Sequence, residues 1–237
     1  VPGGGFVAAG RPRFTARHTV DLRLYRLDRE GHPLRSWGND GIVDVSLGPF
    51  EQDAFDAASA SVLGIADDGS LLLGAYLTVT PSASQRGRGY GLRIAAKLRA
   101  DGRIDASFGK AGLLDAFEYG REERWPVLQP DGTTIAAVYD MLADVYPVLV
   151  RYERFGRDGL RDAGFRYAGP DDYEGVAISG LQQRADGRWW IVTDAALYRL
   201  LADGRRDPAF GDQGRVDLPQ QLARRLSAAG GLRGVVL

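Results

Sequence analysis

A pattern of 18 residues recurs along this chain and constrains the fold more than any other feature. Residues 98–115 read LRADGRIDASFGKAGLLD, and residues 200–217 read LLADGRRDPAFGDQGRVD. Two further copies are found when the sequence is aligned on the glycine that follows the acidic residue, called here the anchor. The four anchors are Gly31, Gly102, Gly159 and Gly204, spaced 71, 57 and 45 residues apart. A pattern that persists while the inserts vary predicts repeated supersecondary units.

Several offsets from the anchor keep one residue type. The residue before it is acidic in every copy: Glu30, Asp101, Asp158 and Asp203. An aromatic residue follows six positions later in every copy: Trp37, Phe108, Phe165 and Phe210. An aspartate follows three positions later in three copies: Asp105, Asp162 and Asp207. Glycine suits a tight turn with positive φ, and the aspartates suit turn capping, so we expect backbone roles for both. We expect the aromatic residue to pack between neighbouring repeats.

Strand-like segments lie between these motifs. An Asp-Gly turn followed by apolar residues, as in DDGSLLLGA from Asp67 and ADGRWWIVT from Ala185, is typical of a β-hairpin. An alternating segment precedes each anchor, as in VDLRLYRL from Val20, and predicts a strand with one buried face. A fourth short run follows the last glycine of the motif in three copies. Each repeat therefore corresponds to four short antiparallel strands, which is the blade of a β-propeller.

The whole chain, residues 1–237, is predicted to form a single all-β propeller domain. Its blades are expected at approximately residues 1–50, 58–117, 124–173 and 176–218, with a partial blade at 222–237. Five hairpin motifs accompany four anchors, which leaves two alternatives: a ring of four to five blades, or part of a larger propeller. We favour a chain that continues on at least one side, because an exposed blade edge invites aggregation.

The segments Ala96–Gly112 (AKLRADGRIDASFGKAG) and Tyr198–Gly214 (YRLLADGRRDPAFGDQG) resemble the delta-60 repeat family of bacterial proteins. The copy at 151–169 departs from that pattern with Arg166 in place of a glycine, and the copy at 25–41 carries Trp37 in place of phenylalanine. The resemblance covers essentially the whole chain. It implies a propeller-like repeat fold in a bacterial protein and brings no catalytic residues with it.

Composition excludes several classes of function. The chain has no cysteine, which excludes disulfides, zinc–thiolate sites and cysteine nucleophiles. Its net charge is −1, so no overall field favours nucleic acid. No apolar run is long enough to span a bilayer. Lack of cysteine leaves the compartment open, and a bacterial periplasmic or secreted location is our expectation.

The sequence shows no recognisable catalytic constellation. The only two histidines are His18, before a strand, and His32, in a turn. No GxSxG elbow and no DxDxDG calcium loop occurs, and the glycine-rich stretch 87–91 is not followed by the residues of a phosphate-binding loop. We therefore predict no catalytic residue, no metal site and no cofactor.

Candidate binding residues come from the strands and the divergent loops. Trp189 and Trp190 are adjacent on a predicted strand and point to opposite faces, so one is expected in the core. The other, Trp190, is a candidate ligand-binding residue together with Tyr139 and Tyr76. The segments 11–19, 78–91 and 140–146 differ most between repeats. Function in repeat folds concentrates in such loops.

These observations favour a non-enzymatic binding or scaffold module that engages a protein partner through its loop faces. The first alternative is a carbohydrate-binding, lectin-like propeller, in which exposed aromatic residues stack on sugars. The second alternative is an enzyme with an active site in a central channel. The identity of the ligand and the oligomeric state stay open at this point.

Overall fold

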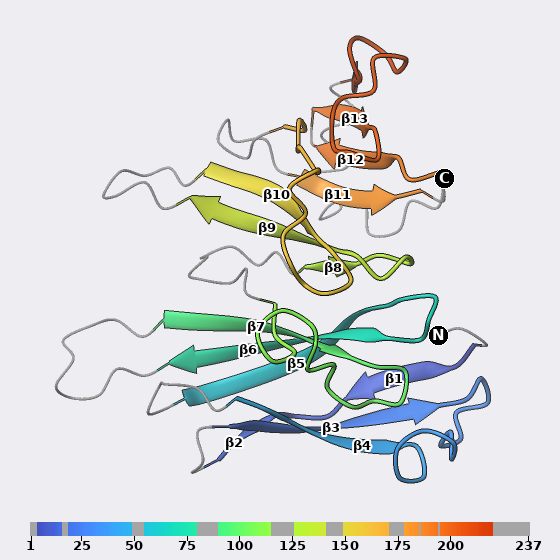
Figure 1. The fold of residues 1–237 in the computed structure, drawn as a ribbon, viewed down its shortest axis with the longest axis vertical. Helices are drawn as coiled ribbons and strands as arrows, with labels where there is room; N and C mark the ends of the chain where they lie inside the picture. The colour runs from blue at the N-terminus through green and yellow to red at the C-terminus, as the bar shows by residue number, and fades with distance from the viewer. Residues whose placement is uncertain are drawn as a thin grey trace, which may run out of the picture. The chain divides into compact units, whose positions relative to one another are not determined.

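A computed structural model describes residues 4–15, 19–48, 55–79, 90–114, 126–140, 149–170, 178–184, 186–193 and 195–219. All of the regular elements within these ranges are β-strands, arranged in four antiparallel sheets (Figure 1). The all-β prediction is therefore confirmed at this level. The partial blade expected at 222–237 lies outside the described residues. The chain divides into two compact units, Val1–Ala136 with Arg154–Arg161 and Ala137–Glu153 with Asp162–Leu237.

The first sheet is built around β3 (Val20–Leu27), the segment predicted from VDLRLYRL. Strand β4 (Ile42–Leu47) pairs along one edge of β3, and β1 (Phe6–Ala9) and β2 (Arg13–Phe14) pair along the other edge. Between β1 and β2 the chain stays attached to β3 through a hydrogen bond of 2.7 Å from the Gly10 N–H to the Arg23 carbonyl. The edge of this sheet is therefore one interrupted strand.

The second sheet, in the order β5-β6-β7, contains β5 (Phe55–Ile65), β6 (Leu71–Val79) and β7 (Tyr90–Leu98). The Asp-Gly turn predicted after Asp67 joins β5 to β6, and the Asp68 carboxylate accepts a 2.8 Å hydrogen bond from the Ser70 N–H. One core cluster takes residues from both of the first two sheets: Val20, Leu22, Leu24, Trp37, Val45, Leu47, Leu71, Leu73, Ala75, Leu77, Ile94, Ala96 and Leu98. These two sheets therefore form the core of the first unit.

The third sheet, in the order β10-β9-β8, contains β8 (Val127–Leu128), β9 (Thr134–Asp140) and β10 (Leu149–Phe155). The boundary between the two units passes through β9 and β10. The fourth sheet follows chain order, β11-β12-β13-β14. It contains β11 (Ile178–Gln183), β12 (Trp189–Thr193), β13 (Ala196–Leu200) and β14 (Arg215–Asp217), the four-stranded meander expected of one repeat.

The repeated aromatic residue lies against the anchor glycine of the next copy at three places. A methyl group added to Gly102 would lie 2.7 Å from Cζ2 of Trp37. The same addition at Gly159 would lie 2.9 Å from Cδ2 of Phe108, and at Gly204 it would lie 3.0 Å from Cε2 of Phe165. Only glycine fits this arrangement, because the site is closed by a ring and the backbone has positive φ, +86° at Gly102.

Polar contacts accompany each of these glycine–aromatic pairs. The Trp37 Nε1–H donates to the Ala100 carbonyl at 2.8 Å. In the next pair the Gly109 N–H donates to the Asp158 carbonyl at 2.6 Å. In the last pair the Arg166 N–H donates to the Asp203 carbonyl at 2.7 Å. Each turn thus receives a ring and a hydrogen bond from the preceding copy, an arrangement called here the glycine–aromatic junction.

Candidate functional site

The repeated aspartates cap turns. The carboxylates of Asp101, Asp158 and Asp203 each accept a hydrogen bond from the backbone N–H two residues ahead, at 2.9, 3.0 and 3.1 Å. The aspartates three positions after the anchor do the same, as shown by Asp162 with the Gly164 N–H at 2.8 Å and Asp207 with the Ala209 N–H at 3.0 Å. Aspartate in this position forms an Asx turn. Over the described residues no group of three or more His, Cys, Asp or Glu side chains is arranged to hold a metal ion.

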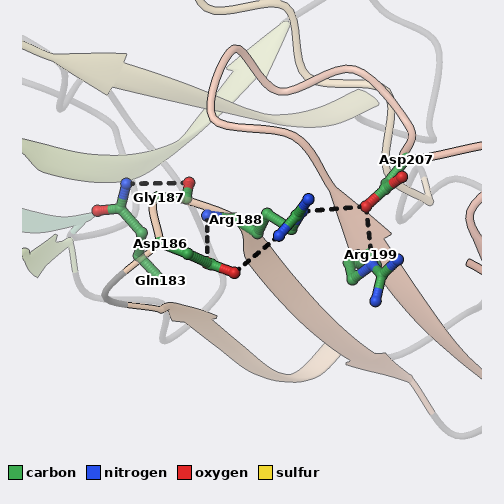
Figure 2. Close-up of polar contacts among 6 residues, drawn as sticks. All are labelled: Gln183, Asp186, Gly187, Arg188, Arg199 and Asp207. Carbon is green, nitrogen blue, oxygen red and sulfur yellow. Dashed lines mark hydrogen bonds and ion pairs between the residues drawn. The ribbon is translucent and has the colours of Figure 1, made fainter. Parts of the chain in front are cut away.

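Asp207 also lies at the centre of an ion-pair network in the fourth sheet (Figure 2). Its Oδ2 accepts a 2.8 Å hydrogen bond from Nε of Arg199 on β13 and lies 3.2 Å from Nε of Arg188, which immediately precedes β12. The Asp207 side chain is only 4% exposed, so solvent screens these contacts little. Arg188 in turn pairs with Asp186 at 2.9 Å.

The surroundings of Asp207 determine what its carboxylate can do. The Ala209 N–H and the positive charge of Arg199 lower the pKa of Asp207, and Arg188 adds to this effect. A carboxylate held ionised in this way is a poor proton donor or acceptor near neutral pH. The network therefore serves to tie the loop after β13 to the strands β12 and β13.

Trp190, the leading aromatic candidate, packs beside Phe210. The ring centroids are 4.9 Å apart at an interplanar angle of 79°, and the Arg199 guanidinium lies 4.7 Å from the Phe210 centroid. Trp189 points to the other face, is 1% exposed and contacts Phe165 edge-on at 5.9 Å. The alternation expected of the two tryptophans is thus observed, with Trp189 in the core and Trp190 half-buried in an aromatic–cation stack.

The other two aromatic candidates, Tyr76 and Tyr139, lie on strands β6 and β9. Tyr76 is half-buried on β6 of the first unit, across from Arg93 of β7. Tyr139 belongs to β9, but its side chain lies outside the described residues. Ligand binding by these two residues stays a prediction.

A groove that none of these candidates lines lies on the first sheet. It has a volume of about 820 Å³, is open to solvent and follows the interruption between β1 and β2. Because β3 alternates, Val20, Leu22 and Leu24 face the core, and the residues between them face the groove. The polar side chains that line the groove are Arg11, Arg13, Asp21, Arg23, Tyr25, Asp44 and Ser46.

Two of the charged groups in the groove are compensated by their neighbours. Arg23 and Asp44 form a bidentate pair at 2.7 and 2.9 Å. The hydrogen bond between them raises the pKa of Arg23 and lowers the pKa of Asp44. Asp21 accepts hydrogen bonds from the hydroxyls of Ser46 at 2.6 Å and Thr19 at 3.1 Å. The carboxylates of the groove therefore already have donors.

Arg11 and Arg13 lack such partners. Both side chains are exposed, and neither guanidinium forms a hydrogen bond or ion pair with another residue of the described ranges. They flank Pro12, which is buried. Proline has no N–H to donate and belongs at an interruption of an edge strand, so the local sequence explains why the strand breaks here. On one side of the groove the charged groups are therefore paired with neighbouring residues. On the other side, the guanidinium groups of Arg11 and Arg13 have no partner among the described residues.

Sequence reasoning pointed to the segment 11–19 as a divergent loop but did not identify the groove. The sequence features that correspond to the groove are the Arg-Pro-Arg triplet at 11–13 and the alternating segment DLRLY at 21–25. Compared with known proteins, the chain matches no family model, no curated protein and no solved structure. Within the described part of the chain, no helix has the length and apolar character needed to cross a bilayer.

Proposed function

We propose that this protein is a non-enzymatic binding module of the β-propeller type, and that its groove binds an acidic segment of a protein partner. The observation that carries the proposal is the pair of uncompensated guanidinium groups, Arg11 and Arg13, at the rim of a groove of about 820 Å³. Arginine recognises carboxylates through two parallel hydrogen bonds, so an Asp- or Glu-rich peptide fits this wall of the groove.

The propeller part of the proposal rests on the junctions between repeats. Three glycine–aromatic junctions join consecutive copies of one motif, and the sheets have three or four antiparallel strands. A series of such sheets joined by one recurrent contact supports a blade-like arrangement of the delta-60 type. A rigid scaffold of this kind presents loops and sheet edges for binding.

The carboxylates of the described residues favour binding over catalysis. Those with perturbed pKa values, Asp44, Asp68, Asp186, Asp203 and Asp207, are all shifted downwards by hydrogen bonds. General acid–base catalysis near neutral pH needs a carboxyl group whose pKa is raised. These groups are instead committed to structural hydrogen bonds.

Peptide binding tests this proposal. A fluorescent peptide of alternating Glu and Ser, titrated with the protein and followed by anisotropy, is expected to bind, whereas a Lys/Ser peptide of equal length is not. The double variant R11Q/R13Q should weaken binding about tenfold or more, because charge-assisted hydrogen bonds are lost. The matched control R29Q/R35Q removes the same charge at two exposed positions outside the groove and should leave binding unchanged. Equal losses in both variants would contradict a specific site.

A second candidate function is carbohydrate binding in the same groove. Tyr25 keeps 38% of its surface exposed there, on the face of β3 that also carries the planar Arg23–Asp44 pair. An aromatic ring beside planar hydrogen-bonding groups is an arrangement suited to a sugar ring. A glycan array probed with the protein and with Y25A distinguishes this candidate: binding of a glycan that Y25A loses and R11Q/R13Q keeps supports it.

A further inference from the structure

The edge of the first sheet contains a β-bulge beside the groove. Ala9 of β1 pairs with Leu24, and Arg13 of β2 pairs with Asp21, so the three residues 10–12 stand opposite only two residues of β3. One extra residue on one strand is the defining feature of a bulge, which bends an edge strand and redirects its side chains. Before the bulge the even-numbered residues of the edge are the more exposed ones, and within and after it the odd-numbered residues are.

The bulge brings two arginine side chains to the same side of the edge strand. Arg11 and Arg13 are both exposed and line the groove, whereas Pro12 between them is buried. Two residues of an extended chain span about 7 Å. The two guanidinium-bearing side chains therefore start about 7 Å apart and face the same groove.

Tyr25 of β3 adds an aromatic ring to this row. It lines the same groove and keeps 38% of its surface exposed. It stands four residues along β3 from Asp21, the partner of Arg13, which corresponds to about 13 Å. Arg11 belongs to the bulge and lies between these two positions. The groove thus presents a ring and two guanidinium groups in one line, at steps of about 7 Å.

We propose that the ligand of this groove is an extended peptide with an aromatic residue and two acidic residues at every second position, an inference that rests on the acidic-peptide function proposed above. The two carboxylates would lie over Arg11 and Arg13, and the aromatic side chain over Tyr25. The pattern is aromatic-x-acidic-x-acidic, or its reverse if the peptide runs in the opposite direction.

The match between peptide and groove follows from strand geometry and charge. An extended peptide presents every second side chain on one face, at the same step of about 7 Å. Each carboxylate accepts two parallel hydrogen bonds from one guanidinium group, and two aromatic rings attract each other in edge-to-face or offset contact. The remaining charged pair of the groove, Arg23 and Asp44, is already joined by hydrogen bonds of 2.7 and 2.9 Å and makes no demand on the ligand.

Peptides of one composition test the spacing. SFSESES and SESESFS place the ring and the carboxylates at alternating positions, whereas SFSSEES places the two carboxylates on adjacent residues, which face opposite sides of an extended chain. Anisotropy titrations of the labelled peptides should give one alternating peptide a Kd at least about tenfold below that of SFSSEES. Equal affinities for all three peptides overturn the spacing but leave acidic-peptide binding intact. No binding of any of the three contradicts the proposed function as well.

Variants of the ring test its contact with the peptide. Y25A should weaken binding of the preferred phenylalanine peptide about threefold to tenfold, and should leave unchanged the affinity for SSSESES, which has serine in place of phenylalanine. L160A is the matched control, because Leu160 is 63% exposed and lies outside the groove, and it should change neither affinity. Equal losses of Y25A for both peptides would overturn the aromatic contact.

A lysine variant separates hydrogen-bond geometry from charge. R11K/R13K keeps both positive charges but lacks the paired N–H groups of guanidinium. It is expected to reduce the preference for the alternating peptide over SFSSEES to less than about threefold, because a point charge discriminates little between the two spacings. An undiminished preference in R11K/R13K would show that the two arginines do not read the spacing.

Discussion

The Phe108 ring packs against Gly159, which lies 51 residues further along the chain. A methyl group placed on Gly159 would lie 2.9 Å from the ring and 2.6 Å from the Gly109 nitrogen. The ring is fully buried. Trp37 with Gly102 and Phe165 with Gly204 repeat this relationship. The anchor glycine thus serves two purposes, since it allows the turn and leaves room for a ring from the preceding copy.

Alanine at Gly159 should therefore destabilise the protein more than alanine at Gly31. Both substitutions place a Cβ on a residue with positive φ, at a cost of about 1–2 kcal/mol. G159A additionally forces the ring or the turn to move, which costs about 1–3 kcal/mol more. Urea unfolding followed by tryptophan fluorescence measures the difference. Equal unfolding midpoints for the two variants would show that the junction tolerates a methyl group.

Truncation of the buried ring should be costly. F108A removes a fully buried side chain and leaves a cavity, so the free energy of unfolding is expected to fall by about 3–5 kcal/mol. Phe6, which is 59% exposed, provides the control. F6A is expected to change the free energy of unfolding by no more than about 0.5 kcal/mol. Comparable losses in the two variants, measured by urea unfolding, would speak against a buried role for Phe108.

The indole of Trp37 contributes a hydrogen bond as well as packing. W37F deletes the 2.8 Å hydrogen bond from Nε1 to the Ala100 carbonyl, and we expect a loss of about 1–2 kcal/mol in thermal unfolding experiments. W190F is the matched change at a half-buried tryptophan that packs against Phe210. It should cost less, because no hydrogen bond from the Trp190 indole exists within the described residues. A larger loss in W190F than in W37F would contradict this account.

The Asp207 network should make stability depend on pH. The pKa of Asp207 is lowered in the folded protein, so the ionised carboxylate stabilises the fold above its unfolded pKa of about 3.9. This stabilisation is lost as the pH falls through the lower, folded pKa. D207N should therefore have a lower unfolding midpoint than the unmodified protein at pH 7, and the two midpoints should converge at acidic pH.

The control for this pH dependence is D212N, at an exposed aspartate whose side chain forms no hydrogen bond or ion pair with the described residues. It should change the unfolding midpoint little at any pH. If the deficit of D207N stayed unchanged at a pH low enough to protonate Asp207 in the folded protein, the effect would come from the shape of the side chain and not from its charge.

Local features of the fold could be predicted from the sequence because their causes are local. The alternation in VDLRLYRL predicted β3, and the Asp-Gly pairs predicted the turns at Gly69 and Gly187, both of which have positive φ. The opposite orientations of Trp189 and Trp190 followed from the two-residue period of a strand. The groove was not predicted, because it requires Arg13 of β2, Asp21 of β3 and Ser46 of β4 to lie on one face of the same sheet.

The sequence by itself determined where the chain turns and which residues repeat, since glycine conformation, Asx capping and strand alternation each act over a few residues. Only the tertiary structure decided which partner each repeated residue meets. Phe108 is covered by a turn 51 residues away, whereas Phe210, in the same motif, packs beside Trp190 instead. Similar local sequences acquire different surroundings because packing depends on the residues that other parts of the chain bring beside them, as the rings of Trp37, Phe108 and Phe165 do at the next anchor glycine.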